Sequence, residues 1–205
     1  MTIIRALNLT IVKLKESLHY AIDSTGIDSY QASKHYEKRI NRIRRPYLKL
    51  SIIGQTTKPH LIEDFSITDK HKNDFNHWKP LLKRFHRKNK IIFADKAGDG
   101  EEMHEIAEQS KNKLYCPLRK KSKNPKGRLR RQMKKLFEED IYHERNKIET
   151  IMFLLKHKGL VTRSKKRNNK FKELAWKILA YNIERTSKFL QIIWNHIISW
   201  DNAKI

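Results

Sequence analysis

The stretch from Tyr142 to Lys156 constrains the fold more than any other, because it contains neither glycine nor proline and has the period of an amphipathic helix. Its apolar residues recur three and four positions apart, which places them on one broad side of the helix: Ile148, Ile151, Met152 and Leu155. A narrow polar column borders that side and contains Tyr142, Arg145, Glu149 and Lys156. We expect the apolar side to pack against a sheet or a bundle. The column beside this contact could then hold metal and phosphate.

Two interpretations of the polar column remain open from the residues alone. Arg145 and Glu149 lie four positions apart, which is the spacing of an ordinary solvated ion pair on a helix surface. Alternatively, Glu149 is one of several carboxylates that converge on a site. The second interpretation requires further acidic residues elsewhere in the chain, held at the edge of the same contact.

Two short apolar stretches end in such acidic residues. The first, from Leu18, is followed by Asp23 and then a turn at Gly26, and the second, from Lys90, ends at Asp95. Asp23 could instead be a turn or cap residue, as aspartate often is before glycine. Asp28 is a weaker competitor for Asp23, and Asp99 is an alternative ligand to Asp95.

The charge of the chain indicates a polyanionic partner. Lys and Arg total 46 against 22 Asp and Glu among 205 residues, a formal net charge of +24, and nucleic acid is the expected ligand. No apolar run approaches the ~18 residues of a membrane span, so we expect no membrane partner. The single cysteine, Cys116, excludes an internal disulfide and a multi-cysteine zinc site. This usage fits a cytoplasmic protein.

Residues 111–135 form a basic insert between the second and third candidate acids. They include twelve Lys or Arg and no acidic residue, and Pro125 and Gly127 interrupt the run. Such a run is usually a solvated loop. Its place in the sequence nevertheless predicts a positive surface beside the carboxylates, where DNA phosphates would bind. The residues expected to make these contacts are Lys120, Lys121, Arg130 and Arg131.

The periodicities predict an α/β fold with a mixed five-stranded sheet and flanking helices. We expect strands over 18–23, 47–57, 61–68, 90–95 and 114–118, and helices over 75–85, 101–110, 142–156 and 171–199. The first three strands should form an antiparallel meander, because their connections offer no crossover helix. The predicted organisation is a short N-terminal segment (1–17), a catalytic domain (18–160), and a basic loop and helix packing on it (161–205).

Three motifs together resemble the insertion-sequence transposases of the DDE type, in the group with a Tyr-Arg-Glu-Lys signature. They are Ile22-Asp-Ser-Thr-Gly26, the strand that ends at Asp95, and Tyr142, Arg145, Glu149 and Lys156 at the signature's spacing. The resemblance implies a ribonuclease-H-like fold, DNA strand cleavage and strand transfer at transposon ends, and a possible homodimer in a synaptic complex. It also implies that Asp23, Asp95 and Glu149 are the catalytic ligands of two Mg²⁺ or Mn²⁺ ions. The partner it implies is double-stranded DNA, of the transposon ends and of the target, and the DNA end would contact Tyr142, Arg145 and Lys156.

The chain departs from this family pattern in two places. Many relatives have Lys-Gly-Tyr-Asp after the second aspartate, whereas this chain has Lys96-Ala-Gly-Asp99 and so lacks the tyrosine. Only 22 residues precede Asp23, so we expect the usual N-terminal DNA-recognition region to be missing. Two other functions stay open beside the active transposase: an inactive DNA-binding remnant, and a metal-dependent nuclease of the same fold.

Overall fold

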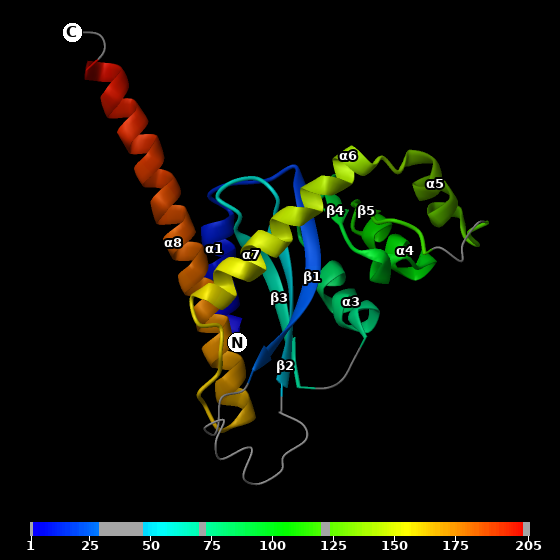
Figure 1. Cartoon of the computed structure of the whole chain (residues 1–205), viewed down its shortest axis with the longest axis horizontal. Helices are drawn as coiled ribbons and strands as arrows, with labels where there is room; N and C mark the ends of the chain where they lie inside the picture. The colour runs from blue at the N-terminus through cyan, green and yellow to red at the C-terminus, as the bar shows by residue number, and fades with distance from the viewer. Residues whose placement is uncertain (1, 29–46, 70–72, 120–123, 203–205) are drawn as a thin grey trace.

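The computed structural model describes residues 2–28, 47–69, 73–119 and 124–202, and within them a mixed five-stranded sheet forms the centre of the molecule (Figure 1). The strands are β1 (His19–Asp28), β2 (Tyr47–Gln55), β3 (Ile62–Thr68), β4 (Ile91–Phe93) and β5 (Lys113–Tyr115). Their spatial order is β3-β2-β1-β4-β5. β1, β2 and β3 are antiparallel neighbours, whereas β4 runs parallel to both β1 and β5. The predicted sheet and its meander are therefore confirmed.

Helices cover both faces of this sheet. The first is α1 (Thr2–Val12), and α3 (Asp74–Arg84) follows β3. A short 3₁₀ turn η1 (Lys96–Gly98) and α4 (Glu101–Gln109) connect β4 to β5. After β5 come α5 (Arg128–Leu136), α6 (Glu139–Tyr142), the 3₁₀ turn η2 (His143–Arg145), α7 (Asn146–His157) and α8 (Arg167–Asn202).

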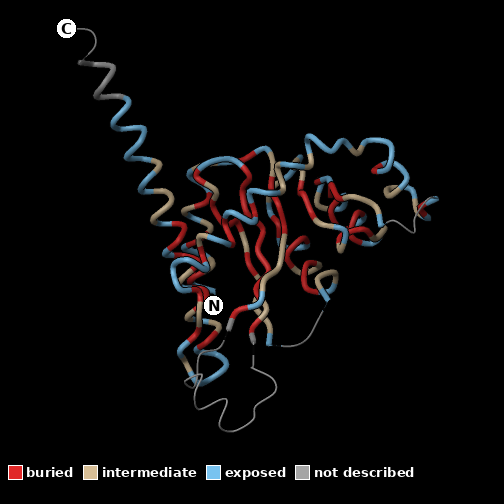
Figure 2. Tube along the Cα trace, in the orientation of Figure 1, coloured by how far each residue is buried: buried red, intermediate tan, exposed pale blue. Residues whose placement is uncertain are grey.

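Alternation of apolar residues along the strands creates two separate cores. On β1, Ala21 belongs to the core that contains Ile148 and Ile151 of α7 and Leu174 of α8. Its neighbour Ile22 belongs to the core under α3 and α4. Successive strand residues point to opposite faces, so this assignment follows from sheet geometry. Figure 2 shows the two buried zones on either side of the strands.

Two helices form where the sequence did not predict them. Residues 2–12 belong to the short N-terminal segment for which no helix was predicted, yet they form α1, which packs on α8 and buries Ile4, Asn8 and Val12. Arg5, which interrupts the apolar pattern, donates to the Phe65 carbonyl at 3.0 Å and lies beside Asp64. The other is α5, within the basic insert that was interpreted as a loop.

The predicted helix over 142–156 is not one regular helix. Tyr142 ends α6, η2 follows, and α7 begins at Asn146. Its apolar side is confirmed, because Ile148, Ile151 and Leu155 are buried. None of the described helices, α8 included, combines the length and apolar character needed to cross a bilayer.

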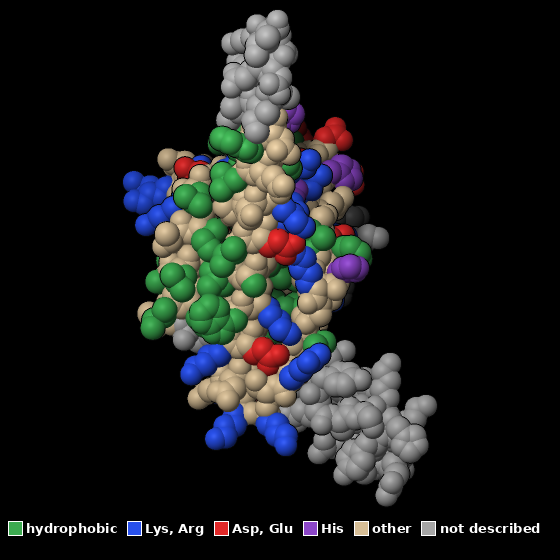
Figure 3. All heavy atoms as spheres, turned by 90° about the vertical axis from the view of Figure 1, so that its left-hand side faces the viewer, with side chains coloured by type: hydrophobic (Ala, Val, Ile, Leu, Met, Phe, Trp, Pro, Cys, Tyr) green, Lys and Arg blue, Asp and Glu red, His purple; other side chains and the backbone are tan. Residues whose placement is uncertain are grey.

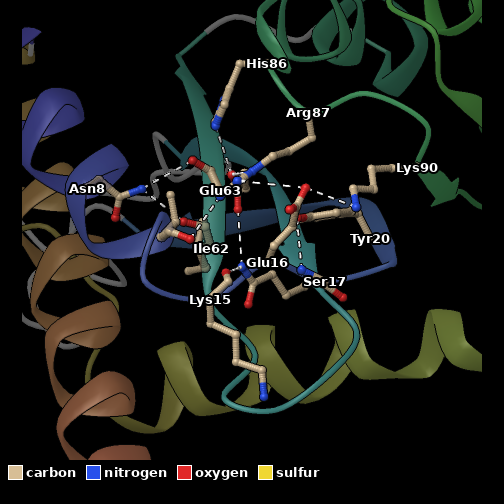
Figure 4. A network of polar contacts seen from close by, with 12 residues as sticks. Asn8, Lys15, Glu16, Ser17, Tyr20, Ile62, Glu63, His86, Arg87 and Lys90 are labelled. Carbon is tan, nitrogen blue, oxygen red and sulfur yellow. Dashed lines mark hydrogen bonds and ion pairs between the residues drawn. The ribbon is translucent and has the colours of Figure 1, made fainter.

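A buried ion-pair network at one end of the sheet joins segments far apart in the sequence (Figure 4). The Glu63 side chain is fully buried and accepts from Arg87 Nε at 2.7 Å. His86 Nε2 lies 3.2 Å from the same carboxylate, and Gln55 Nε2 donates to it at 3.4 Å. Arg87 also donates to the Val12 carbonyl at 2.9 Å. The network therefore ties β2 and β3 to the segments that lead into β1 and β4.

Candidate active site

Asp23 and Asp95 lie side by side because β1 and β4 are parallel neighbours. Ala21 pairs with Phe93 in that register, so the residues two positions further on, Asp23 and Asp95, stand at the same level and on the same face. The prediction that both strands end at these residues is half wrong. Asp95 follows the last residue of β4, but β1 continues through Asp23 to Asp28 because β2 pairs with it over that length.

The position of α7 over these strands depends on a glycine of β2. A Cβ atom at Gly54 would lie 2.5 Å from Ile151 Cδ1 and 3.1 Å from Ile148 Cδ1, so only glycine allows the helix to pack this closely. Ile148 and Ile151 face the sheet, and Glu149 between them is exposed, with 60% of its side chain accessible. The helix therefore brings Glu149 to the same face of the sheet as Asp23.

Arg145 joins two of the three candidate acids. Its NH1 donates to Glu149 Oε1 at 2.9 Å, and its NH2 lies 3.4 Å from Asp23 Oδ2. The Arg145 side chain is only 16% exposed, unlike a solvated surface residue. The simple surface ion pair is thus an incomplete description, since the guanidinium also reaches a strand residue 122 positions away.

The remaining contacts of the two aspartates fix their orientation. Asp23 Oδ1 accepts from the backbone N–H of Ser24 at 2.8 Å, and Asp95 Oδ1 accepts from that of Ala97 at 2.8 Å, where it caps η1. Burial raises the pKa of Asp23; the Ser24 N–H and Arg145 oppose this shift, and the negative charge of Asp95 adds to it. Asp23 is therefore a carboxylate whose charge is incompletely compensated within the chain.

The donor chemistry of this site fits Mg²⁺ or Mn²⁺. All three candidate ligands offer carboxylate oxygens, which these hard cations prefer. Within the described parts of the chain, no three His, Cys, Asp or Glu side chains stand close enough together to hold a metal ion. Instead a cationic guanidinium lies between the carboxylates of Asp23 and Glu149. The structure thus already places a positive charge between two of the proposed ligands.

The other two residues of the predicted column lie in different environments. Tyr142 is half-buried, with its ring 5.4 Å from that of Phe137, which stacks in turn on Tyr115. Burial is the largest influence on the pKa of Tyr142 and raises it. Lys156 is exposed near the end of α7. Contact of either residue with DNA stays a prediction.

Two acidic residues that the sequence did not single out for this role attach the basic helix α5 to the body. Glu101 accepts from the backbone N–H groups of Leu129 and Arg130 at 2.9 and 3.1 Å, which satisfies the first turn of α5. Gly127, with φ of 104°, precedes that turn, and a Cβ there would collide with the Glu101 carboxylate. Acidic residues just after a strand, followed by a basic run, are the signal that could have indicated this attachment.

Asp99 makes the second attachment. It accepts from Arg130 Nε at 2.6 Å, from Arg130 NH2 at 2.9 Å and from the Arg119 backbone N–H at 2.8 Å. Burial alone would raise the pKa of Asp99, but these donors outweigh it and lower the pKa. Asp99, considered above as an alternative metal ligand, and Arg130, predicted to bind phosphate, are therefore each engaged in this internal pair. A contact of Arg130 with DNA stays a prediction.

The outward side of α5 is strongly basic. Its exposed cations are called here the basic helix face: Arg128, Arg131, Lys134 and Lys135. Arg131 was among the predicted phosphate contacts, and its exposure leaves that prediction open. Lys120 and Lys121 lie outside the residues that the structure describes.

The model of the family described as "Transposase DDE domain" matches residues 15–183. The chain belongs to the DDE transposase family. The match extends from the segment before β1 to the middle of α8, so it includes Asp23, Asp95 and Glu149. A search of curated proteins found no match.

Among solved structures, the chain is similar to the piggyBac transposase in a cryo-EM synaptic complex with hairpin DNA. The TM-score is 0.56 at 10% sequence identity, and the match covers 85% of this chain. It spans about half of that transposase, 48% of its length. At this identity the likeness establishes the fold: a mixed sheet with helices on both faces, of the ribonuclease-H-like type found in transposases.

Proposed function

We propose that this chain is the catalytic domain of an insertion-sequence transposase, which cleaves DNA at transposon ends and transfers the cut strand into target DNA. The observation that carries the proposal is the Arg145 guanidinium shared by Asp23 and Glu149, with Asp95 just beyond the end of the neighbouring strand β4. Family membership supports the reaction class, and the net charge of +24 supports DNA as the partner.

Asp23, Asp95 and Glu149 would hold two Mg²⁺ or Mn²⁺ ions. When bound, these ions would activate an attacking water or 3′-hydroxyl and stabilise the leaving oxygen. The protein contributes rigid positions for two of the carboxylates, because Asp23 lies within a strand that β2 pairs along its length and Asp95 is fixed by its cap on η1. Glu149, which is exposed, can move by rotation of its side chain.

Arg145 has two successive roles in this proposal. Without DNA it neutralises Asp23 and Glu149, which would otherwise repel each other. When the DNA end arrives, its guanidinium is close enough to these acids to bind the phosphate beside the scissile bond. Lys156, two turns beyond Glu149 on α7, would bind a neighbouring phosphate, and Tyr142 would line the entry. The basic helix face would bind the DNA backbone away from the phosphate that is cleaved.

The decisive experiment measures nicking of DNA that contains the element's end, with Mg²⁺ or Mn²⁺. Asp23→Asn, Asp95→Asn and Glu149→Gln should each abolish nicking and preserve DNA affinity at matched salt. Asp140→Asn, which neutralises an exposed acid on the adjoining α6, is the matched control and should retain activity. Absence of cleavage with either ion would favour the inactive DNA-binding remnant. Cleavage of DNA junctions without regard to element ends would favour the nuclease.

A second experiment separates positioning from affinity. Arg145→Ala and Lys156→Ala should slow single-turnover cleavage at saturating DNA, because a misplaced scissile phosphate cannot be corrected by more substrate. Binding of Mn²⁺ to the DNA-free protein, followed by electron paramagnetic resonance, gives a readout independent of activity. Arg145→Ala should strengthen that binding because it removes the competing cation. Normal cleavage by Arg145→Ala would show that this arginine does not position the scissile phosphate.

A further inference from the structure

The outer side of α8 carries an exposed apolar stripe that no other described part of the chain covers. Its large members are Trp176, Ile183, Leu190 and Trp194, which are 53%, 52%, 56% and 62% exposed. The small residues Ala180 and Ser187 lie between them and are also exposed. We call these six residues the α8 seam. Figure 3, which views the α8 side of the molecule, shows hydrophobic side chains gathered on this face.

The spacing of the α8 seam is that of a helix that pairs with another helix. Its six positions are separated alternately by four and three residues, which keeps a straight stripe along an α-helix. The stripe lies opposite the side of α8 that packs on the body, where Leu174, Ile178 and Tyr181 are buried. The helix is therefore apolar on two opposite sides, and only one of them has a partner among the described residues.

The order of large and small residues indicates what that partner is. In an antiparallel pair of α8 helices, Ile183 would face the partner's Ser187, and Ala180 would face the partner's Leu190. Each of these layers combines a large side chain with a small one, as close packing requires. Trp176 would face the partner's Trp194 at each end of the contact. A parallel pair would instead place small against small, Ala180 on Ala180 and Ser187 on Ser187, whereas tryptophan meets tryptophan in either arrangement.

The size and charge of the α8 seam also suit a second copy. It spans ~27 Å at about 1.5 Å per residue. A pair of chains would bring four tryptophans into the contact, and each is more than half exposed in the single chain. A tryptophan side chain buries about 150–250 Å², so the exposed parts of these four would bury roughly 300–600 Å². That is a quarter to a half of the ~1,200 Å² that a stable interface needs. None of the six residues is charged. Glu184 on the flank is already paired with Lys158 and Lys188, which limits repulsion between two copies.

We propose that two copies of this chain associate through the α8 seam as an antiparallel helix pair with two-fold symmetry. The symmetry is isologous, because each copy offers the same stripe to the other. This proposal rests on α8 alone and goes beyond the carboxylate site, so either can fail without the other.

The first test is the association state of the DNA-free chain by sedimentation velocity over a range of concentrations. The wild-type chain should form dimers, and the double substitution Ile183→Gln with Leu190→Gln should weaken dimerisation at least tenfold. The control replaces Leu136 and Ile141, which are 51% and 37% exposed on α5 and α6, by glutamine and should leave dimerisation unchanged. A wild-type chain that stays monomeric, or a seam variant that dimerises like the control, would overturn the proposal.

Cysteine cross-linking tests the orientation. Chains with Ile183→Cys mixed with chains with Ser187→Cys should form an intermolecular disulfide, and neither variant alone should do so efficiently. The native Cys116 will not interfere, because it is buried and burial raises its pKa to about 12. Cross-linking of Ser187→Cys chains to one another, with no product from the mixture, would refute the antiparallel arrangement. Thermal unfolding of each variant checks that the exposed substitutions leave the fold intact.

Discussion

Removal of the Glu63 carboxylate should destabilise the protein far more than removal of an exposed carboxylate of the same charge. The Glu63 side chain is 0% exposed, and its main partner Arg87 is 12% exposed. Glu63→Ala would leave the Arg87 guanidinium buried beside His86 without its carboxylate. Loss of one member of a buried pair costs about 3–5 kcal/mol, because the remaining charge loses its main partner and is poorly reached by water. Among the described residues, the Arg87 guanidinium would keep only the Val12 carbonyl and the Glu16 carboxylate 4.0 Å away.

The matched control is Asp69→Ala. Asp69 pairs with Arg167 through two hydrogen bonds of 2.6 and 3.0 Å, but the side chains are 36% and 57% exposed. An exposed pair contributes about 0–1 kcal/mol. Both substitutions raise the net charge by one, so any general effect of charge on stability is the same in the two variants.

Urea and thermal unfolding, followed by circular dichroism, measure the difference. For a chain of this size about 1 kcal/mol corresponds to ~2–4 °C in the unfolding midpoint, so Glu63→Ala should lower it by ~6–20 °C. Asp69→Ala should lower it by no more than ~4 °C. Glu63→Gln, which keeps a hydrogen-bond acceptor, should fall between them. Equal midpoints for Glu63→Ala and Asp69→Ala would refute the argument that burial makes this network costly to break.

Three further predictions follow from the charges of the site. Asp23→Asn should raise the thermal midpoint near neutral pH, because the pKa of Asp23 is raised in the folded protein. The contribution of Asp23 to folding stability is therefore fully present below the unfolded pKa and is lost as pH rises through the folded pKa. A lower midpoint for the variant would contradict this. The pKa of Asp99 is lowered instead, so the attachment of α5 should be stable above the unfolded pKa and weaken as pH falls through the folded pKa. Hydrogen exchange of the α5 amides measures this, and Asp99→Asn should show faster exchange already at neutral pH. Neutralising the basic helix face should reduce the salt dependence of DNA binding by up to about 0.9 per lost phosphate contact and weaken all DNA sequences alike, whereas an unchanged salt slope would show that α5 does not contact the backbone.

The sequence predicted the sheet and most helices because apolar periodicity is a local property. It failed where a long-range partner decides the structure. The basic insert looked like a loop, yet Leu129 and Met133 face the body and Glu101 caps the helix from another segment. The N-terminal helix was missed because Arg5 breaks the apolar pattern, and only the structure shows its partner on β3.

The candidate site was predictable to a similar extent. Motif spacing singled out Asp23, Asp95 and Glu149 as candidates, and the fold brings them to one face of the sheet. The link from Arg145 to Asp23 joins residues 122 positions apart, so no local pattern could indicate it. The α8 seam was missed for a different reason. Periodicity marks the apolar residues of the helix as packing residues but cannot separate core from interface, and only their exposure in the structure separates Ile183 from Ile178.

The continuation of β1 beyond Asp23 divides the site into a fixed part and an adjustable part. Asp23 stands within a strand that pairs with β2 from Tyr20 to Asp28, so its backbone is as rigid as the sheet itself. Glu149 and Arg145 instead belong to a helical segment that crosses the sheet on apolar contacts and begins with a 3₁₀ turn. The strand thus holds Asp23 in a fixed position, while the helical segment can shift. Any adjustment to metal or to a DNA end has to come from this helical segment, and substitutions that stiffen or displace it should alter catalysis while the sheet stays intact.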